Sequence, residues 1–370
     1  EHWFLSADNP TGTFKVIEPR RQGVEYSVVD HDDKFLIRHN DGAINFTLVE
    51  APIASPGRAN WKTVIPHSDD SYLTGVTAFK DFLVIQAREG GLGTIRIRKF
   101  SDGTDHIVKF PETAYSVFPR SNAEYDTSTL RLSYASFITP ISVFDYDMNT
   151  RSLTLLKETP VLGYDRTKYT STRFFAKAPD GAEVPVTVVH RKDLKLDGSN
   201  PTLLYSYGSY GINTEVSFSS ATLSLLDRGM VYAIAQIRGG SDKGRKWYED
   251  GRMMNKKNTF TDFIAAAETL IAKGYTKPEK LAIRGGSAGG LLMGAVVNVR
   301  PDLFKAVIAD VPFVDVINTM LDKDLPLTVA EYEQWGNPNE KPAFDYMITY
   351  SPYDNVAKKA YPAILATTGL

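Results

Sequence analysis

Cysteine is absent from this sequence of 370 residues. Its absence excludes disulfide bonds, a thiolate nucleophile and a metal site built from thiolates. Apolar runs are short, and none approaches the length that a membrane-spanning helix needs. An excess of one charge is also missing, because the formal net charge is only −2. Composition therefore favours neither a nucleic-acid nor a membrane partner. What is present is the composition of a globular protein, with 42% hydrophobic and 23% charged residues.

A chain of this length exceeds one typical hydrophobic core, so two domains are expected. Residues 1–163 are rich in short strands in which apolar and polar residues alternate. Three similar units open at Asp33, Lys80 and Ser128, roughly 47 residues apart, and a partial unit from Trp3 to about Val29 precedes them. This repeat predicts three to four blades of a β-propeller, fewer than a closed ring needs. An ordinary β-sandwich is the alternative.

Residues 164–370 alternate strands with helices, which is typical of an α/β domain. The expected helix runs from Thr259 to Lys273, with its apolar residues on one face and Gly274 after its end. The expected strands are 186–190, 202–205, 231–236, 281–283, 306–309 and 363–367. The pattern predicts a mainly parallel, doubly wound sheet in this half of the chain.

The most informative stretch is LAIRGGSAGG, residues 281–290. A short apolar strand leads into a glycine-rich turn around Ser287, and a helical pattern follows. This order is the context that a nucleophile elbow requires. In an elbow the serine hydroxyl projects from the end of the sheet, and the next backbone N–H, here that of Ala288, faces the developing oxyanion. We therefore expect Ser287 to be the nucleophile of an α/β-hydrolase fold, with a plain glycine turn as the alternative.

A serine nucleophile needs a base, and in α/β-hydrolases the acid and the histidine follow the serine in the chain. All six histidines precede Ser287, so His190, the last of them, stands in the wrong order. Of the acids after the serine, we consider only Asp310, which ends a strand. The loop after strand 363–367 is the more natural place for the acid, and there the sequence stops. We expect the acid and the base to lie beyond Leu370, and an N-terminal part to be missing because the first residue is not Met.

Two further clusters accompany the serine. A buried strand ends in the loop Ser206-Tyr207-Gly208-Ser209-Tyr210. In this architecture such a loop lies beside the elbow, so the Tyr207 hydroxyl can donate a hydrogen bond to an oxyanion. Aromatic packing explains the loop equally well. Glu331 and Glu333 are separated by one tyrosine, and two carboxylates in a cleft would select a cationic side chain. A solvated helix end is the simpler interpretation of this pair.

The second half resembles, nearly end to end, the prolyl oligopeptidase family of serine peptidases, and most closely its oligopeptidase B group. The resemblance rests on YSYGSYG (205–211), LSLLDRGMVYAIAQIRGG (223–240), KWYEDGR (246–252), KKNTFTDF (256–263), GGSAGGLLMGAVVNVRPDLF (285–304), DVPFVDV (310–316), EYEQWGNP (331–338) and TTGL (367–370). The first half is looser, but it suits the seven-bladed propeller of that family.

The resemblance implies a role for each matching residue of the catalytic centre. Ser287 corresponds to the nucleophile. The Tyr207 hydroxyl and the Ala288 N–H correspond to the two donors of the oxyanion hole. The triad acid of the family comes directly after TTGL, and its histidine lies in a later glycine-rich loop. The propeller of the family covers the active site and excludes folded proteins by their size.

The resemblance also implies a substrate pocket. Glu331 and Glu333 correspond to paired glutamates that make the S1 pocket select Arg or Lys, and Phe313 resembles the apolar wall of this pocket. A second basic subsite in the family uses two acids after the YGSYG loop. Here only Glu215 is acidic and the second position is Ser217, so a dibasic preference should be weaker.

Together these observations predict a serine endopeptidase that cleaves short peptides after Arg or Lys through an acyl-enzyme at Ser287, without a metal or cofactor. We expect residues 1–163 to be C-terminal blades of an incomplete propeller, and residues 164–370 to be an α/β-hydrolase domain truncated at its C-terminus. The polypeptide alone is expected to have no turnover, and the resemblance implies a cytoplasmic location. A peptidase that cleaves after proline and a non-catalytic binding scaffold remain as alternatives.

Overall fold

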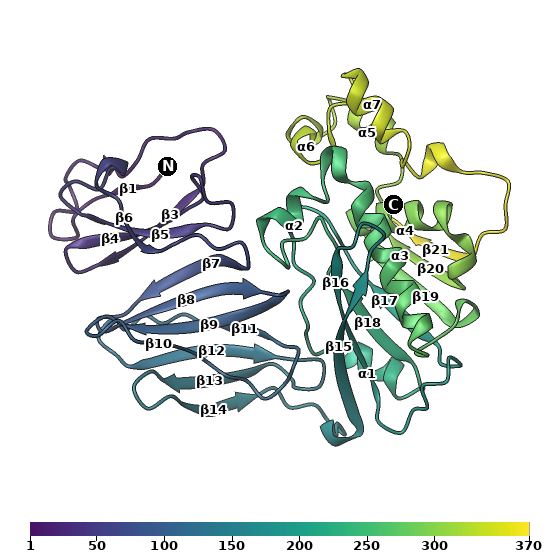
Figure 1. Cartoon of the computed structure of the whole chain (residues 1–370), viewed down its shortest axis with the longest axis horizontal. Coiled ribbons are helices and arrows are strands. Elements are labelled where there is room, and N and C mark those ends of the chain that lie inside the picture. Colours follow the sequence, from purple (N-terminus) through teal and green to yellow (C-terminus); the bar gives the residue numbers. More distant parts are fainter. Residues whose placement is uncertain (370) are drawn as a thin grey trace.

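The computed structural model describes residues 1–369 and contains two parts of different architecture (Figure 1). The propeller part, residues 1–159, consists of small antiparallel sheets. The hydrolase part, residues 169–367, consists of one large mixed sheet with helices around it. Within residues 1–369, none of the helices combines the length and the apolar character needed to cross a membrane.

The propeller part contains three four-stranded sheets, each with its strands in sequence order, as propeller blades have. The first sheet comprises β3 (Tyr26–His31), β4 (Lys34–His39), β5 (Thr47–Pro52) and β6 (Lys62–Ile65). The second comprises β7 (Ser71–Ala78), β8 (Phe82–Glu89), β9 (Leu92–Lys99) and β10 (Asp105–Ile107). The third comprises β11 (Ser116–Pro119), β12 (Thr129–Ala135), β13 (Ser142–Asp147) and β14 (Ser152–Glu158).

The predicted blades are confirmed, but the predicted limits of the first unit were wrong. Strand β3, which we had assigned to a partial preceding unit, pairs with β4 and completes the first four-stranded sheet. What precedes it is only the two-stranded pair of β1 (Trp3–Phe4) and β2 (Lys15–Val16). Neighbouring sheets share apolar clusters; Leu36 and Leu48 of the first pack with Leu83 and Ile85 of the second.

The hydrolase part is built on a seven-stranded sheet with the order β15-β16-β18-β17-β19-β20-β21. Its strands are β15 (Tyr169–Lys177), β16 (Glu183–Arg191), β17 (Thr202–Tyr205), β18 (Val231–Ala235), β19 (Leu281–Gly286), β20 (Ala306–Asp310) and β21 (Ala363–Thr367). The β15–β16 and β16–β18 pairs are antiparallel, and the other four pairs are parallel. The predicted mainly parallel sheet of an α/β-hydrolase fold is confirmed.

Helices cover both faces of this sheet. The helices of this part are α1 (Ser220–Leu226), α2 (Arg245–Glu249), α3 (Lys257–Ala272), α4 (Ala288–Val299), α5 (Val316–Leu321), α6 (Thr328–Trp335) and α7 (Lys341–Met347), of which α3 and α4 cover one face and α1 the other. Because side chains alternate along a strand, Val188 and Ala233 join the core beneath α3 and α4, whereas Val189 and Ile234 join a cluster with Leu226 of α1.

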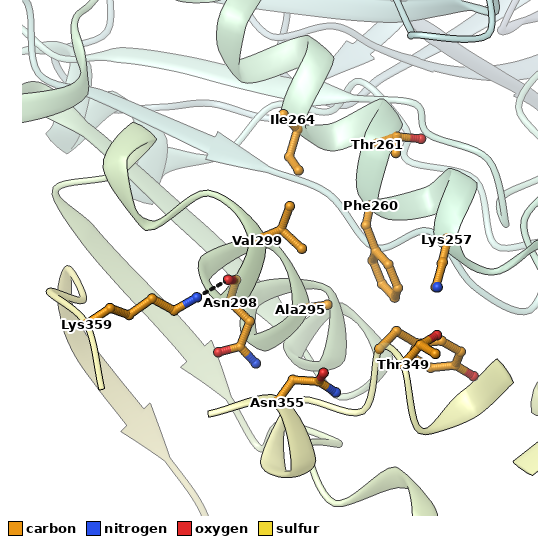
Figure 2. A pocket seen from close by; sticks show the side chains of 11 residues that line it. Lys257, Phe260, Thr261, Ile264, Ala295, Asn298, Val299, Thr349, Asn355 and Lys359 are labelled. Carbon is orange, nitrogen blue, oxygen red and sulfur yellow. Dashed lines mark hydrogen bonds between the residues drawn. The ribbon is translucent and has the colours of Figure 1, made fainter. Parts of the chain in front are cut away.

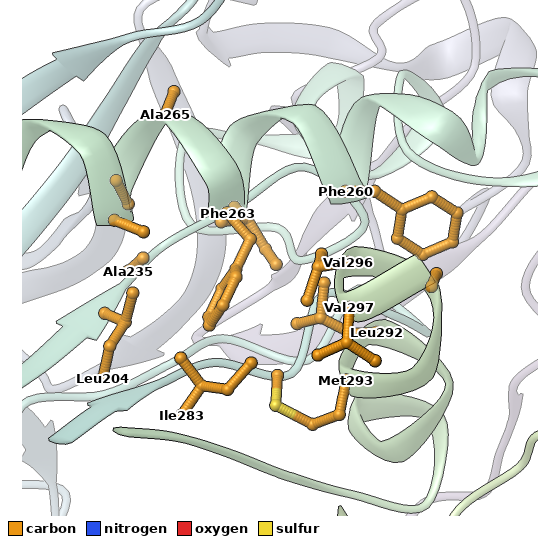
Figure 3. Close-up of a cluster of buried hydrophobic side chains, with 14 of the residues drawn as sticks. Leu204, Ala235, Phe260, Phe263, Ala265, Ile283, Leu292, Met293, Val296 and Val297 are labelled. Atoms are coloured by element: carbon orange, nitrogen blue, oxygen red, sulfur yellow. The ribbon is translucent and has the colours of Figure 1, made fainter. Parts of the chain in front are cut away.

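The main core lies between the sheet and helices α3 and α4. Figure 3 shows Phe263 of α3 above Leu204 and Ile283 of the two central strands, with Val296 and Met293 of α4 beside them. All five side chains are fully buried. Burial of such side chains stabilises the fold by roughly 1.5–3 kcal/mol each, and this packing fixes the place where β19 meets α4.

Candidate active site

Ser287 occupies the sharp corner between β19 and α4. Its backbone has φ 55° and ψ −117°, a conformation that L-residues rarely adopt. The Ser287 N–H donates to the Asp310 carbonyl at 2.8 Å, and the Ser287 carbonyl accepts from the Phe313 N–H at 3.0 Å. A Cβ on Gly285 would lie 2.2 Å from the Gly289 carbonyl oxygen. The turn is therefore strained, held by backbone bonds and possible only with glycine at position 285.

The two predicted oxyanion donors lie on either side of this corner. Ala288 is the first residue of α4 and is buried, so its N–H has no acceptor within the helix. The Tyr207 ring packs against the start of α4, since a Cβ on Gly289 would lie 3.4 Å from Tyr207 Cδ2. Burial raises the pKa of the Tyr207 phenol, and its interaction with the Ser287 side chain opposes that rise. The structure thus brings Tyr207, Ser287 and Ala288 together.

A buried lysine holds the loop that carries Tyr207. Gly208 and Tyr210 both have positive φ, +73° and 59°. Lys256 Nζ donates to the Gly208 carbonyl at 2.6 Å and to Ser209 Oγ at 2.9 Å. The Lys256 side chain is fully buried, and burial lowers its pKa to about 7.

Glu331 lies in an aromatic setting next to this loop. Its Oε2 accepts from the Tyr210 hydroxyl at 2.7 Å and from Trp335 Nε1 at 2.6 Å. The Trp335 ring in turn lies 5.3 Å from that of Phe313, centroid to centroid. Burial raises the pKa of Tyr210, and its bond to the Glu331 carboxylate adds to the rise. The Phe313 N–H donates a backbone hydrogen bond to the Ser287 carbonyl. The aromatic residues and the Glu331 carboxylate are therefore connected to the elbow through Phe313.

Glu333 is placed differently from Glu331. Both residues belong to α6, but positions two apart on a helix do not face each other. Glu333 is exposed, and its carbonyl oxygen accepts from Arg252 Nη1 at 2.9 Å. The structure therefore brings Glu331, but not the Glu333 carboxylate, into contact with the aromatic group.

Glu215 is already paired with a residue of the propeller part. Its Oε1 accepts from Arg88 Nη1 at 2.5 Å. The cavity that Glu215 lines has a volume of about 640 Å³ and extends to Gly286, the residue before Ser287. Ser217 lines the same cavity. Glu215 thus lines a cavity next to the elbow, and its negative charge is paired with the positive charge of Arg88.

The acid and the base of a triad are not assembled at Ser287 by the described residues. The Asp310 carboxylate accepts from Arg284 Nε at 2.7 Å and from Thr367 Oγ1 at 3.0 Å. The His190 ring bonds the Arg191 carbonyl at 2.7 Å. The other five histidines belong to the propeller part, and within residues 1–369 no histidine is hydrogen-bonded to Ser287.

A second cavity lies on another side of the hydrolase part, between α3, α4 and the segment 349–359 (Figure 2). Its volume is about 420 Å³. Phe260, Ile264 and Val299 line its apolar side, and at its rim Lys359 Nζ donates to the Asn298 carbonyl. None of the predicted site residues lines this cavity.

Three residues of the site were missed from the sequence. Tyr210 and Trp335 complete the surroundings of Glu331, and Lys256 supports the tyrosine loop. Tyr210 and Trp335 stand inside motifs that had been singled out, so their position near candidate residues was a usable signal. Lys256 opens the KKNTFTDF motif, but nothing in that motif indicates burial, because a lysine is usually exposed.

The comparisons with known proteins agree with this geometry. The model of the "Prolyl oligopeptidase family" matches residues 216–370, and the model of the "Prolyl oligopeptidase, N-terminal beta-propeller domain" matches residues 1–159. Dipeptidyl aminopeptidase BI of Pseudoxanthomonas mexicana is 48% identical over 97% of this chain and 50% of its own length. Protease 2 of Moraxella lacunata is 42% identical over 99% of this chain and 53% of its own length.

Solved structures lead to the same group. Oligopeptidase B from Trypanosoma brucei with covalently bound antipain, in a closed form, has a TM-score of 0.89 and 41% identity over 96% of this chain and 51% of that one. Oligopeptidase B from Leishmania major has a TM-score of 0.88 and 42% identity, with the same coverage. The chain spans about half the length of the relatives that it matches. With its propeller sheets, its α/β sheet and its strained serine elbow, the chain belongs to the prolyl oligopeptidase family of serine peptidases.

Proposed function

We propose that the protein is a serine endopeptidase that hydrolyses short peptides after Arg or Lys. The observation that carries the proposal is the Glu331 carboxylate, which Tyr210 and Trp335 hold next to the elbow. Its second oxygen can accept from a guanidinium or an ammonium group in a charge-assisted hydrogen bond. The Trp335 and Phe313 rings can pack against the aliphatic stem of such a side chain. The solved relatives are named oligopeptidase B, and this name supports a peptidase that acts on short peptides.

In the proposed mechanism Ser287 Oγ attacks the scissile carbonyl carbon while a histidine removes its proton. The carbonyl oxygen becomes the oxyanion, and the Tyr207 hydroxyl and the Ala288 N–H donate hydrogen bonds to it. Breakdown of the tetrahedral intermediate protonates and releases the amine, leaving an acyl-enzyme on Ser287. Water then attacks the ester, releases the peptide acid and returns the proton to Ser287.

We propose that residues 1–163 and 164–370 are the two domains that serve this reaction. We also propose that the 370-residue polypeptide alone has no turnover, because no histidine of the described residues contacts Ser287. Hydrolysis of an arginine reporter peptide by this polypeptide would contradict that proposal. We propose that the protein binds short peptides rather than nucleic acid or a membrane. The family resemblance supports a cytoplasmic location.

Peptide binding tests the function without requiring turnover. We expect a fluorescent peptide ending in Ala-Ala-Arg to bind the Ser287→Ala chain at least about tenfold more tightly than one ending in Ala-Ala-Pro, since one charge-assisted bond is worth about 1.5–3 kcal/mol. Fluorescence anisotropy measures both affinities. Tighter binding of the proline peptide would favour the post-proline alternative, and binding of neither would favour the non-catalytic scaffold.

Two isosteric substitutions locate the charge that is responsible. Glu331→Gln should remove most of the preference for arginine, because it removes the negative charge that the aromatic pocket presents. Glu333→Gln is the matched control and should change the preference less than twofold, since its exposed carboxylate contributes only at longer range. Equal effects of the two substitutions would show that both glutamates serve the pocket.

Dipeptide release is a second candidate function. It is favoured by the 48% identical relative, which is named a dipeptidyl aminopeptidase. An enzyme of that kind must recognise the free amino group of its substrate, whereas an endopeptidase need not. The peptide Ala-Arg, labelled at its C-terminus and with its N-terminus either free or acetylated, separates the two functions. Loss of binding on acetylation would support dipeptide release, and unchanged affinity would support the endopeptidase.

A further inference from the structure

The turn between β8 and β9 reaches across to the hydrolase part (Figure 1). Gln236 Nε2 donates to the Gly91 carbonyl at 2.8 Å, and Arg173 donates to the Gly90 carbonyl. A Cβ on Gly91 would lie 2.7 Å from Gln236 Oε1. The backbone of this turn is therefore seated tightly on the hydrolase sheet, and it carries the last side chains of β8 with it.

Arg88 is the charged side chain that this turn delivers. It is 4% exposed, and its Nη2 donates to the Gly91 carbonyl at 3.0 Å. Nη1 donates to Glu215 Oε1 at 2.5 Å, and Nη2 lies 3.7 Å from Asp242 Oδ1. Burial raises the pKa of Asp242 to about 7, against the opposing effect of Arg88. Of the two acidic residues next to Arg88, Glu215 is more exposed than Asp242.

Two carboxylate–arginine ion pairs determine the charge of the cavity beside the elbow. Its acidic lining residues are Glu215 and Asp310. Arg88 pairs with Glu215, and Arg284, which also lines the cavity, pairs with Asp310 at 2.7 Å. A peptide residue next to the scissile bond that entered this space would meet two neutralised carboxylates. A cationic residue would gain a bond to Glu215 only in competition with a guanidinium that is already in place.

We propose that Arg88, carried by the propeller part, sets the charge preference of this cavity. Paired with Glu215, it makes the cavity accept uncharged residues next to the P1 side chain. Without it, Glu215 would become a site for a second cation. Substrate selection would then be shared between the two parts of the molecule, with Glu331 selecting a cation at P1 and Arg88 cancelling the preference for a cation at the neighbouring position. This inference rests on the proposed peptidase function.

The test compares two labelled peptides, one ending in Ala-Ala-Arg and one ending in Ala-Arg-Arg, on the Ser287→Ala chain. With Arg88 in place, the two affinities should agree within about twofold. The additional substitution Arg88→Gln should make the dibasic peptide bind about tenfold more tightly than the monobasic one, the gain expected of one charge-assisted hydrogen bond. Arg88→Met, which keeps part of the aliphatic stem, replaces this variant if the glutamine variant does not fold.

Two controls separate the charge from its surroundings. Arg173→Gln removes an arginine that bonds the same turn without touching Glu215, so the affinity ratio should stay as it was. Adding Glu215→Gln to Arg88→Gln should return the ratio to about one. An unchanged ratio in Arg88→Gln, or a tenfold dibasic preference already present with Arg88, would overturn the proposal. Failure of the monobasic peptide to bind at all would instead contradict the proposed function.

If the monobasic peptide does not bind, the pairing of Arg88 with Glu215 can still be tested by a measurement that needs no peptide. In a double-mutant cycle of Arg88→Gln and Glu215→Gln, the shifts of the urea midpoint should be non-additive, because each substitution removes the same ion pair. Additive shifts would mean that Arg88 does not hold Glu215, and the proposal would fall whatever the peptides do.

Discussion

At the scale of single residues, the buried ammonium of Lys256 is the most unusual electrostatic feature of the site. Its Nζ bonds Gly208 and Ser209 and lies 5.1 Å from the centroid of the Trp335 ring. It therefore touches both the loop that carries Tyr207 and the aromatic residue that binds Glu331. Burial lowers its pKa to about 7, whereas an unfolded chain leaves a lysine near its ordinary value of about 10.4.

This difference predicts that the protein becomes more stable as the pH rises from about 7 towards 10. In that range the unfolded chain binds a proton at Lys256 and the folded chain does not, so the free energy of unfolding increases with pH, by at most about 1.4 kcal/mol per unit. Lys256→Met should flatten that slope. Urea denaturation between pH 7 and 9.5 measures it. Lys257→Met, at the exposed neighbouring lysine, is the control and should keep the slope of the wild type; equal slopes in all three proteins would contradict the prediction.

At the scale of elements, the corner between β19 and α4 depends on the glycine that precedes it by two positions. A Cβ on Gly285 would lie 2.2 Å from the Gly289 carbonyl oxygen, which belongs to the helix backbone and cannot move alone. On Gly286 it would lie 3.3 Å from the Asp310 carbonyl oxygen, a contact that a small shift relieves. Both glycines belong to β19, so the two positions differ mainly in the space around them.

Gly285→Ala should therefore destabilise the hydrolase part by about 3 kcal/mol, and Gly286→Ala by about 1 kcal/mol or less. Urea titration followed by circular dichroism gives both values. The affinities of the two variants for the Ala-Ala-Arg peptide show whether the corner also positions the pocket, since the Ser287 carbonyl accepts a hydrogen bond from the Phe313 N–H. Equal destabilisation by the two substitutions would show that the strand and the helix can separate at this corner.

The elements could be predicted from the sequence where the signal is local. The strand, glycines and helix around Ser287 follow from adjacent residues, as do the blade strands with their alternating pattern. The limits of the first blade failed because the pairing of β3 with β4 depends on register and not on composition. The direction in which the Glu333 side chain points could not be predicted, because it depends on the residue at which α6 begins. The bond between Arg88 and Glu215 joins residues 127 positions apart, and a single sequence contains no record of such a contact.

At the scale of the whole molecule, the propeller and hydrolase parts are joined by polar groups that both of them need. Asn45 of the propeller part is 2% exposed. Its Nδ2 donates to the carbonyl oxygens of Ser68 and Asp69 at 3.1 and 3.0 Å, and its Oδ1 accepts from the Arg245 N–H at 2.9 Å. A Cβ on Gly244 would lie 2.6 Å from that same Oδ1. One amide thus fixes a loop of the propeller and the start of α2 in the hydrolase part.

Asn45→Ala should therefore uncouple the unfolding of the two parts. The substitution leaves two carbonyl groups and one N–H without their partner, and each such group costs about 1–3 kcal/mol when it stays buried. The cost is avoided if the parts separate and water reaches these groups. We expect the wild type to melt in one calorimetric transition and Asn45→Ala to melt in two, the first several degrees lower. Asn60→Ala is the control, because the exposed Asn60 side chain bonds only Ser55 within the propeller part. A single, unshifted transition in Asn45→Ala would contradict the prediction and show that the Asn45 amide is not needed to hold the two parts together.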